Sequence, residues 1–226
     1  MTHILQKHYE QYHCRKSNYL NHGINLRPMT DLKDVCPDTD KPDVFQRAMN
    51  FCLSSDSRDP IKILKILMKD PDVPFHGPVH HSLVPFAVLT AYKNSGGDID
   101  LAEAMEKAHK RGSIIPAAVC GHWGACGAAL GCGIAFSVIT NDGPLAGDIW
   151  SKDQIMVSSC LSRISEYGGP RCCKRDAYLA IPRAAEYFKE YLGVEMEIPE
   201  KIKCYVSENN PVCLKEVCPF NPDHKG

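Results

Sequence analysis

Residues 98–112, DIDLAEAMEKAHKRG, show most plainly that this chain is helical. Acidic side chains stand at the start of this stretch and basic ones at its end, which is the arrangement that a helix dipole favours. Gly112 is expected to end the helix. The stretches on either side show apolar positions at three- and four-residue spacing, so we predict a mostly α-helical protein.

The neighbouring stretches extend this helical pattern in both directions. Asp59-Pro60 is a good helix start, because proline fits the first helical turn. Gly96 and Gly97 end a helix that begins at Pro78 and is expected to be kinked by an internal proline. A strand is expected only at residues 202–206, IKCYV. Helices are predicted over residues 43–53, 60–69, 78–95, 98–112, 148–167 and 170–193, and a buried core helix within residues 117–140.

The chain is expected to form one helical domain with two appendages. Residues 41–193 carry the helical pattern. Residues 1–40 are a basic, histidine-rich lead-in of irregular or helical structure, and residues 194–226 are a short cysteine-rich tail. The length of 226 residues is enough for one sizeable core.

Charge and hydropathy argue against nucleic acid and membranes as partners. The 26 basic and 27 acidic side chains nearly balance, which gives no electrostatic attraction to a polyanion. The first twenty residues lack the features of a signal peptide. Residues 117–140 are long and nearly uncharged, but they are rich in glycine and cysteine and are interpreted as a core helix rather than a membrane span. We therefore expect a cytoplasmic protein.

Twelve cysteines are the most unusual feature of the composition. Without an export signal they are expected to be free thiols, so that some bind metal or react. Four of them have no partner at ligand spacing and are expected to be small core residues: Cys14, Cys36, Cys52 and Cys160. The others fall into three groups: Cys120, Cys126 and Cys132; Cys172 and Cys173; and Cys204, Cys213 and Cys218.

The tail thiols Cys204, Cys213 and Cys218 are the strongest metal ligands in the sequence. They lie in a stretch with little apolar material, where a metal would supply the missing folding energy. The spacing C-x8-C-x4-C-P is not that of a zinc finger, and the closing Cys-Pro suggests iron–sulfur ligation. A fourth ligand must come from elsewhere in the chain. The alternative is a loop held to the core by three buried thiols.

The adjacent pair Cys172 and Cys173 lies in GGPRCCKRD, residues 168–176. If a helix starts at Pro170, the pair stands among unpaired backbone N–H groups, and the helix dipole and nearby cations favour thiolate. We therefore expect a lowered pKa for at least one of the two. One thiol would then act as nucleophile or metal ligand, with Arg171 and Lys174 stabilising the thiolate. The alternative is a capped helix with a solvated basic turn.

Two further motifs are weaker. His76, His80 and His81 stand at a helix start, where they would ligate a metal or, in the case of His80, donate a proton; a structural or capping role is the alternative. In CGHWGACGAALGCG the cysteines are six residues apart and would point to different faces of a helix, so at most one of them joins a metal site. Glycines 124, 127 and 131 would share one face for close helix packing.

The chain resembles a family known only as a domain of unknown function, found in anaerobic archaea and bacteria. The motifs HGPVHH, GACGAALG, GGPRCCKRD and the closing C…C…CPF carry this resemblance over about residues 70–220. In some members the domain follows an S-adenosylmethionine-dependent methyltransferase domain, which makes such an enzyme a possible partner. The resemblance implies that the family pattern includes His76, His80, His81, Cys126, Cys172, Cys173, Cys204, Cys213 and Cys218.

Together these observations predict a protein with a cysteine-ligated metal centre, an iron–sulfur cluster, beside a reactive thiolate pair. Sulfur transfer or thiol redox chemistry fits best if the protein is an enzyme. Two alternatives remain open: a non-enzymatic metal-binding or delivery module, and a methyltransferase partner with a structural zinc in its tail.

Overall fold

The computed structural model describes residues 43–224, and all of the regular secondary structure in this part of the chain is helical. The prediction of a mostly α-helical domain is confirmed. No strand is found between residues 43 and 224, so the expected strand at 202–206 is wrong: this segment has no neighbouring strand with which to pair. The elements are α2 (Val44–Ser54), α3 (Pro60–Leu67), α4 (His80–Asn94), α5 (Leu101–Ser113), α6 (Val119–His122), α7 (Gly127–Thr140), α8 (Asp148–Ser165), α9 (Cys173–Leu192) and the 3-10 helix η3 (Lys215–Val217).

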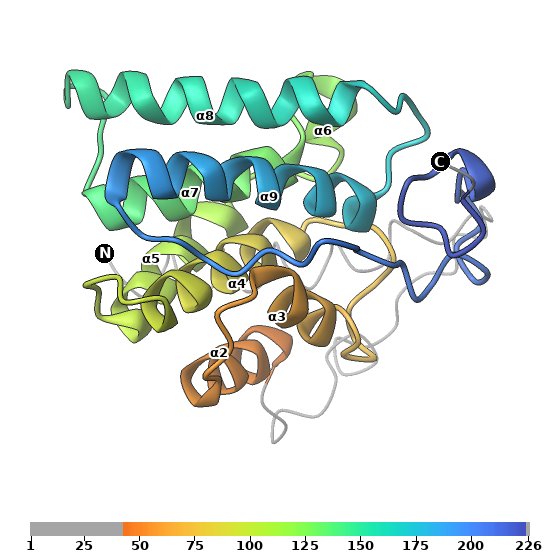
Figure 1. The fold of residues 1–226 in the computed structure, drawn as a ribbon, viewed down its shortest axis with the longest axis horizontal. Coiled ribbons are helices and arrows are strands. Elements are labelled where there is room, and N and C mark those ends of the chain that lie inside the picture. The colour runs from red at the N-terminus through yellow and green to blue at the C-terminus, as the bar shows by residue number, and fades with distance from the viewer. Residues whose placement is uncertain (1–42, 225–226) are drawn as a thin grey trace, which may run out of the picture. The chain divides into compact units, whose positions relative to one another are not determined.

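Helix α4 is the centre of the domain. All of its residues from 80 to 92 are buried, which is expected of a helix that is apolar on every side. It packs against α2, α3, α5 and α7, while α8 and α9 pair with each other and cover α7 (Figure 1). Cys52 and Cys160 lie in this core with no exposed surface, as predicted. Cys14 and Cys36 lie outside the described residues.

Close approach of α7 to α4 depends on glycine. A Cβ atom at Gly131 would lie 2.9 Å from Val84 Cβ, and one at Gly127 would lie 2.2 Å from Cδ2 of the His81 ring. The predicted packing role is confirmed for these two glycines. Gly124 instead lies outside the helix, with φ of +71° and open space around it.

The core helix expected within residues 117–140 is broken into α6 and α7. The left-handed conformation of Gly124 cannot continue a right-handed helix. It separates α6 from the N-cap of α7 at Cys126. The exposed Trp123 ends α6, so only the second half of the segment is a core helix.

Helix α5 runs through Gly112 to Ser113 rather than ending at that glycine. Gly112 is buried, and a Cβ there would lie 2.7 Å from the His81 carbonyl oxygen. The glycine therefore allows α5 to pack closely on the start of α4. Asp100 caps the other end of α5 by accepting a hydrogen bond from the Glu103 backbone N–H at 3.0 Å.

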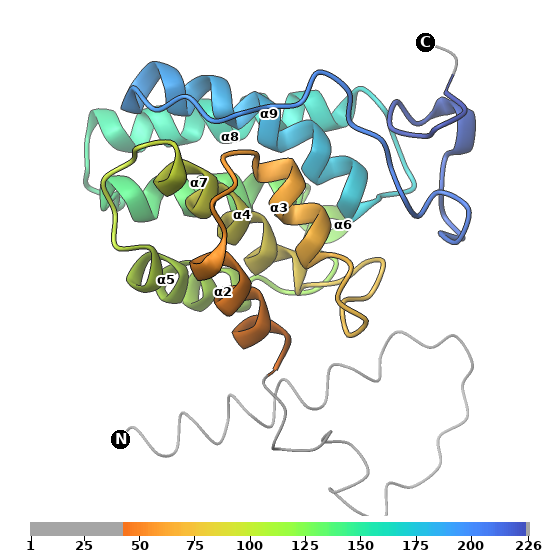
Figure 2. The same cartoon turned by 60° about the horizontal axis from the view of Figure 1, so that its bottom comes forward.

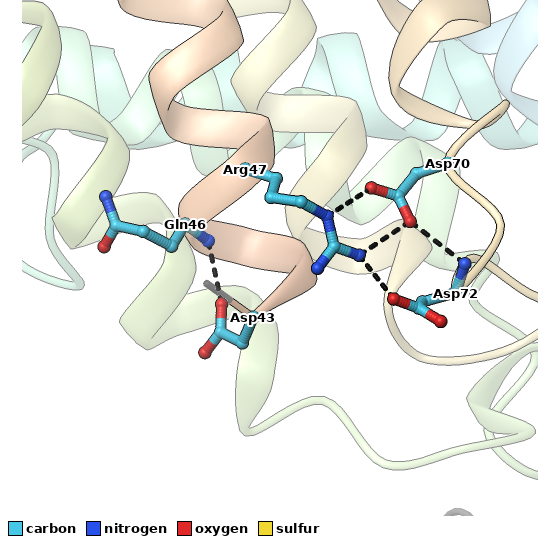
Figure 3. Close-up of polar contacts among 5 residues, drawn as sticks. All are labelled: Asp43, Gln46, Arg47, Asp70 and Asp72. Carbon is cyan, nitrogen blue, oxygen red and sulfur yellow. Dashed lines mark hydrogen bonds and ion pairs between the residues drawn. The ribbon is translucent and has the colours of Figure 1, made fainter. Parts of the chain in front are cut away.

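Helix α2 is fixed to the turn after α3 by charged contacts. Asp43 caps α2 by accepting from the Gln46 backbone N–H at 2.8 Å (Figure 3). Arg47 donates to Asp70 at 2.7 Å and to Asp72 at 2.6 Å (Figure 3). The guanidinium lowers the pKa of Asp70. Because these side chains are partly exposed, each ion pair of Arg47 adds at most about 1 kcal/mol to the free energy of unfolding.

Helices α4, α7 and α9 all begin at the end of the domain to which the tail returns (Figures 1 and 2). Helix α9 starts at Cys173, with Cys172 as its N-cap, three residues later than the predicted start at Pro170. The tail runs past α3 in extended form. The Glu197 N–H donates to Arg58 O at 3.0 Å and fixes the tail to the helical domain. Within the tail, the Cys204 N–H donates to Phe220 O at 2.6 Å. In residues 43–224 no helix has the length and hydropathy that a membrane span requires.

Candidate functional site

Four cysteines from two distant parts of the chain line one small cavity. Cys172 comes from the N-cap of α9, and the other three come from the tail. The cavity has a volume of about 10 Å³, the space of roughly one water molecule. Cys172, one of the pair that the sequence singled out, is therefore the thiol that the fold brings to the three tail cysteines. The lining residues are Cys172, Arg175, Tyr178, Cys204, Ser207, Asn210, Cys213, Leu214, Cys218, Phe220 and Asn221.

Backbone N–H groups from two or three residues further along the chain point at three of these sulfur atoms. The Lys215 N–H donates to Cys213 Sγ at 3.4 Å. The Phe220 N–H donates to Cys218, and the Arg175 N–H donates to Cys172. Hydrogen bonds of this kind favour a thiolate over a thiol. Turns that direct amide donors at cysteine sulfur suit these residues for anionic ligation.

Asn210 connects the cavity to the histidine motif. Its side-chain Nδ2 donates to Cys172 Sγ at 3.6 Å. Its Oδ1 lies 3.2 Å from His76 Nε2 and accepts from the Val212 backbone N–H at 3.2 Å. With only 3 % of its surface exposed, Asn210 holds the tail turn against α9.

A buried lysine stands beside the cavity without a carboxylate partner. Lys174 is 2 % exposed. Its Nζ donates one long hydrogen bond, 3.4 Å to Phe75 O, and lies 5.2 Å from the centre of the Phe75 ring. Within residues 43–224 it forms no ion pair, and negative charge on Cys172, Cys173 and Cys204 would act on it most strongly.

Arg175 is the second buried cation at this site, with 3 % exposure. Its Nε lies 3.2 Å from Asp176 Oδ1, and its Nη2 donates to the Gly168 and Pro170 carbonyl oxygens at 2.9 and 3.1 Å. These bonds anchor the loop before α9 and fix the position of Cys172.

Cys172 and Cys173 point to different surroundings, as expected for helix neighbours. Cys172 faces the tail cavity, while Cys173 receives the Gly77 backbone N–H. Burial raises the pKa of both thiols, that of Cys173 to about 11. The expected lowering of the pKa is therefore wrong for the metal-free protein, because burial outweighs the helix terminus and the nearby cations. A catalytic role for the pair, with Arg171 and Lys174, stays a prediction.

Cys126 lies apart from the four-cysteine cavity. Its Sγ is 3.7 Å from Asp176 Oδ2, and burial raises its pKa to about 12. It lines a separate cavity of about 260 Å³ together with Cys120, Arg171 and Asp176. The structure thus does not place Cys126 beside the tail cysteines.

The three histidines are ordered by hydrogen bonds and do not line the cavity. His80 Nε2 lies 3.0 Å from Pro74 O, and His81 bonds to the backbone of Ile115. Because a carbonyl only accepts, Nε2 of His80 carries the proton. Burial lowers the pKa of His80 to about 3, which favours the neutral ring. A proton-donor role for His80 stays a prediction. The Nδ1 atoms of His76, His80 and His81 are buried and have no hydrogen-bond partner within residues 43–224.

Tyr178 was missed by sequence reasoning. It lines the cavity from the buried face of α9. The helical spacing from Cys172 was readable, but nothing in the sequence showed that the tail would fold back onto this face. Asn210 had a weak signal, since NNP is a turn sequence.

In residues 43–224 no three side chains of the types His, Cys, Asp and Glu converge on one point in a geometry that would hold a metal ion. The four thiols share a cavity without meeting at its centre. Iron–sulfur and zinc ligation therefore both stay predictions.

The model of a family of unknown function, DUF5714, matches residues 48–221. The chain belongs to this family. The match runs from α2 to just beyond Cys218, so it includes all four cavity cysteines and the three histidines. No curated protein and no solved structure matches the chain. The expected membership of a family of unknown function is confirmed, while the motifs that were expected to carry it, its host organisms and its fusion to methyltransferases stay predictions.

Proposed function

We propose that the protein binds a metal centre through Cys172, Cys204, Cys213 and Cys218. The observation that carries this proposal is their common cavity, which brings the start of α9 together with three tail cysteines. The tail has few buried apolar side chains of its own. A bound metal would therefore supply stabilisation that packing does not.

The charges around the cavity support an anionic centre. A buried ammonium normally has a partner, because an isolated ion is costly to remove from water. Lys174 has no carboxylate within ion-pair distance among the described residues, and three thiols are its nearest acidic groups. Metal-bound thiolates would be the missing counter-charge.

An iron–sulfur cluster is the centre that we favour. A single zinc ion needs four sulfurs at about 2.3 Å from one point, whereas the cavity thiols do not converge in that way within the described residues. A cluster offers several iron atoms and accepts thiolates that are farther apart. Zinc is the second candidate, because the cavity of about 10 Å³ has the size of a single ion, whereas a cluster requires the tail turns that carry the thiols to move apart.

The geometry supports binding more strongly than group transfer. A nucleophilic cysteine needs an accessible thiolate, but Cys172 is 8 % exposed and is directed toward the other ligands. The raised pKa of Cys173 also favours its neutral thiol. We therefore propose a metal-binding protein, and sulfur transfer and a methyltransferase partner stay predictions.

Purification without oxygen tests this proposal. Iron and acid-labile sulfide, together with visible absorption, would identify a cluster, and one zinc per chain without colour would identify the second candidate. Separate replacement of Cys172, Cys204, Cys213 and Cys218 by alanine should lower metal content. Cys120→Ala is the matched control, because Cys120 lines the other cavity. Metal-free wild-type protein, or equal metal loss in the control, would contradict the proposal.

Metal removal should also loosen the tail while the helices persist. Hydrogen exchange of residues 200–224 is expected to become faster after chelation, whereas α4 and α7 keep their protection. Unchanged protection of the tail would mean that ordinary packing holds it, as the alternative interpretation of the three thiols requires.

A further inference from the structure

Tyr178 carries a buried hydroxyl that no protein group satisfies. The residue is 1 % exposed, and its phenolic oxygen has no hydrogen-bond partner among the described residues. The hydroxyl of Tyr205 is also buried without a partner. An unsatisfied buried polar group costs about 1–3 kcal/mol, so two of them at one place require an explanation.

The position of Tyr178 is set by packing around its ring. Phe220 meets the ring edge-on, with centroids 5.4 Å apart and planes at 87°. Lys65 Nζ lies 5.6 Å from the ring centre. The ring is therefore held between the helical core and the tail.

Tyr178 shares a cavity with the proposed ligands. It lines the four-cysteine cavity. Negative charge on Tyr205, Cys204 and Cys172 would act on its phenol. A phenol O–H is a donor, and the cysteine sulfurs that line the same cavity can accept from it.

We propose that the Tyr178 hydroxyl donates a hydrogen bond to a cysteine sulfur of the metal centre and so tunes that centre. This inference rests on the proposed function. Tyr178 is then a positioning residue, because its hydroxyl stabilises negative charge on sulfur. In the metal-free protein this hydroxyl has no hydrogen-bond partner within residues 43–224.

The effect on an iron–sulfur cluster has a defined direction. Reduction adds negative charge to the cluster, so a donor to its sulfur stabilises the reduced form more than the oxidised form. Tyr178→Phe removes the donor and keeps the ring. We expect the reduction potential of the variant to be lower by about 59 mV, which corresponds to a tenfold change in a one-electron equilibrium. If the centre is zinc, we expect tenfold faster alkylation of its bound thiolates.

The metal-free protein provides the contrasting measurement. Removal of an unpaired buried hydroxyl should leave the urea midpoint of the metal-free protein unchanged or higher. A residue with only a structural role would instead lose stability in both forms. Tyr191→Phe is the matched control, because Tyr191 lies near the opposite end of α9, and it should change neither measurement.

The experiment compares wild-type protein, Tyr178→Phe and Tyr191→Phe, each with and without metal. A lower potential or faster alkylation in Tyr178→Phe alone, with an undiminished metal-free midpoint, supports the inference. Equal values in all three metal-loaded proteins overturn it and leave the metal centre standing. A lower metal-free midpoint also overturns it, because the hydroxyl would then have a protein partner. Wild-type protein without metal overturns both proposals.

Discussion

Replacing Asp153 by asparagine should stabilise the protein at alkaline pH. Asp153 lies on α8, is 8 % exposed, and its Oδ1 is buried without a partner. Burial raises the pKa of this carboxyl to about 7, and Asp142 raises it further while Arg111 opposes the shift. The folded protein therefore keeps the proton that the unfolded chain, with the ordinary pKa of 3.8, releases.

The sign and size of the effect follow from this difference. A raised pKa in the folded state makes the contribution of Asp153 to stability complete below about pH 4, and it is lost as the pH rises through 7. The full shift of the Asp153 pKa corresponds to about 4 kcal/mol of unfolding free energy. Partial access of water reduces this to about 2 kcal/mol. Asparagine carries no charge, so Asp153→Asn avoids the loss.

Urea unfolding of both proteins between pH 5 and pH 9, at constant metal content, measures the difference. We expect the advantage of Asp153→Asn to grow by about 1 kcal/mol between pH 5 and pH 8, because the rest of the loss occurs below pH 5. Asp56→Asn is the control for loss of a carboxylate, because Asp56 is exposed. An advantage that is the same at every pH would refute the reasoning, since it would show that the carboxyl is ionised in the folded protein throughout this range.

Three further substitutions test the packing and the caps. Gly131→Ala should destabilise the protein by about 1–3 kcal/mol in urea unfolding, because the new Cβ would lie 2.9 Å from Val84 Cβ; no loss would show that α4 and α7 can separate. Asp59→Ala should cost about 1 kcal/mol, because Asp59 accepts from two backbone N–H groups at the start of α3, and an unchanged midpoint would contradict the cap. Asn210→Ala should speed hydrogen exchange at residues 204–218 while that of α4 stays constant, because Asn210 links Cys172 to the tail turn.

The helical domain was predictable because its signals are local. Apolar spacing and the Asp59-Pro60 start placed α3, and the end of α9 at Gly193 follows from the left-handed conformation that glycine adopts there. The break between α6 and α7 was not predicted, because composition alone cannot show which glycine leaves the helix. The expected strand failed because strand formation depends on a neighbouring strand, which a sequence segment does not reveal.

The candidate site was predictable in its parts and not in its assembly. The sequence identified the tail cysteines and the pair at the start of α9 as separate groups. Their meeting depends on the path of the tail past α3, and this path depends on long-range contacts such as Glu197 with Arg58. The lowered pKa expected for at least one of Cys172 and Cys173 was not found, for a related reason. Burial is a property of the whole fold, whereas a helix terminus and its cations are visible in the local sequence.

The position of the cavity cysteines in the chain has a consequence for biosynthesis. Cys172 precedes α9, while Cys218 follows every α-helix between residues 43 and 224. During translation the ribosome therefore releases the segments that form the helical core before it releases the last of the four thiols. If these cysteines share a metal, its insertion is the last step of maturation and acts on a core that is already folded. A cell starved of that metal would then accumulate a precursor with native helices and a tail that is not attached to them.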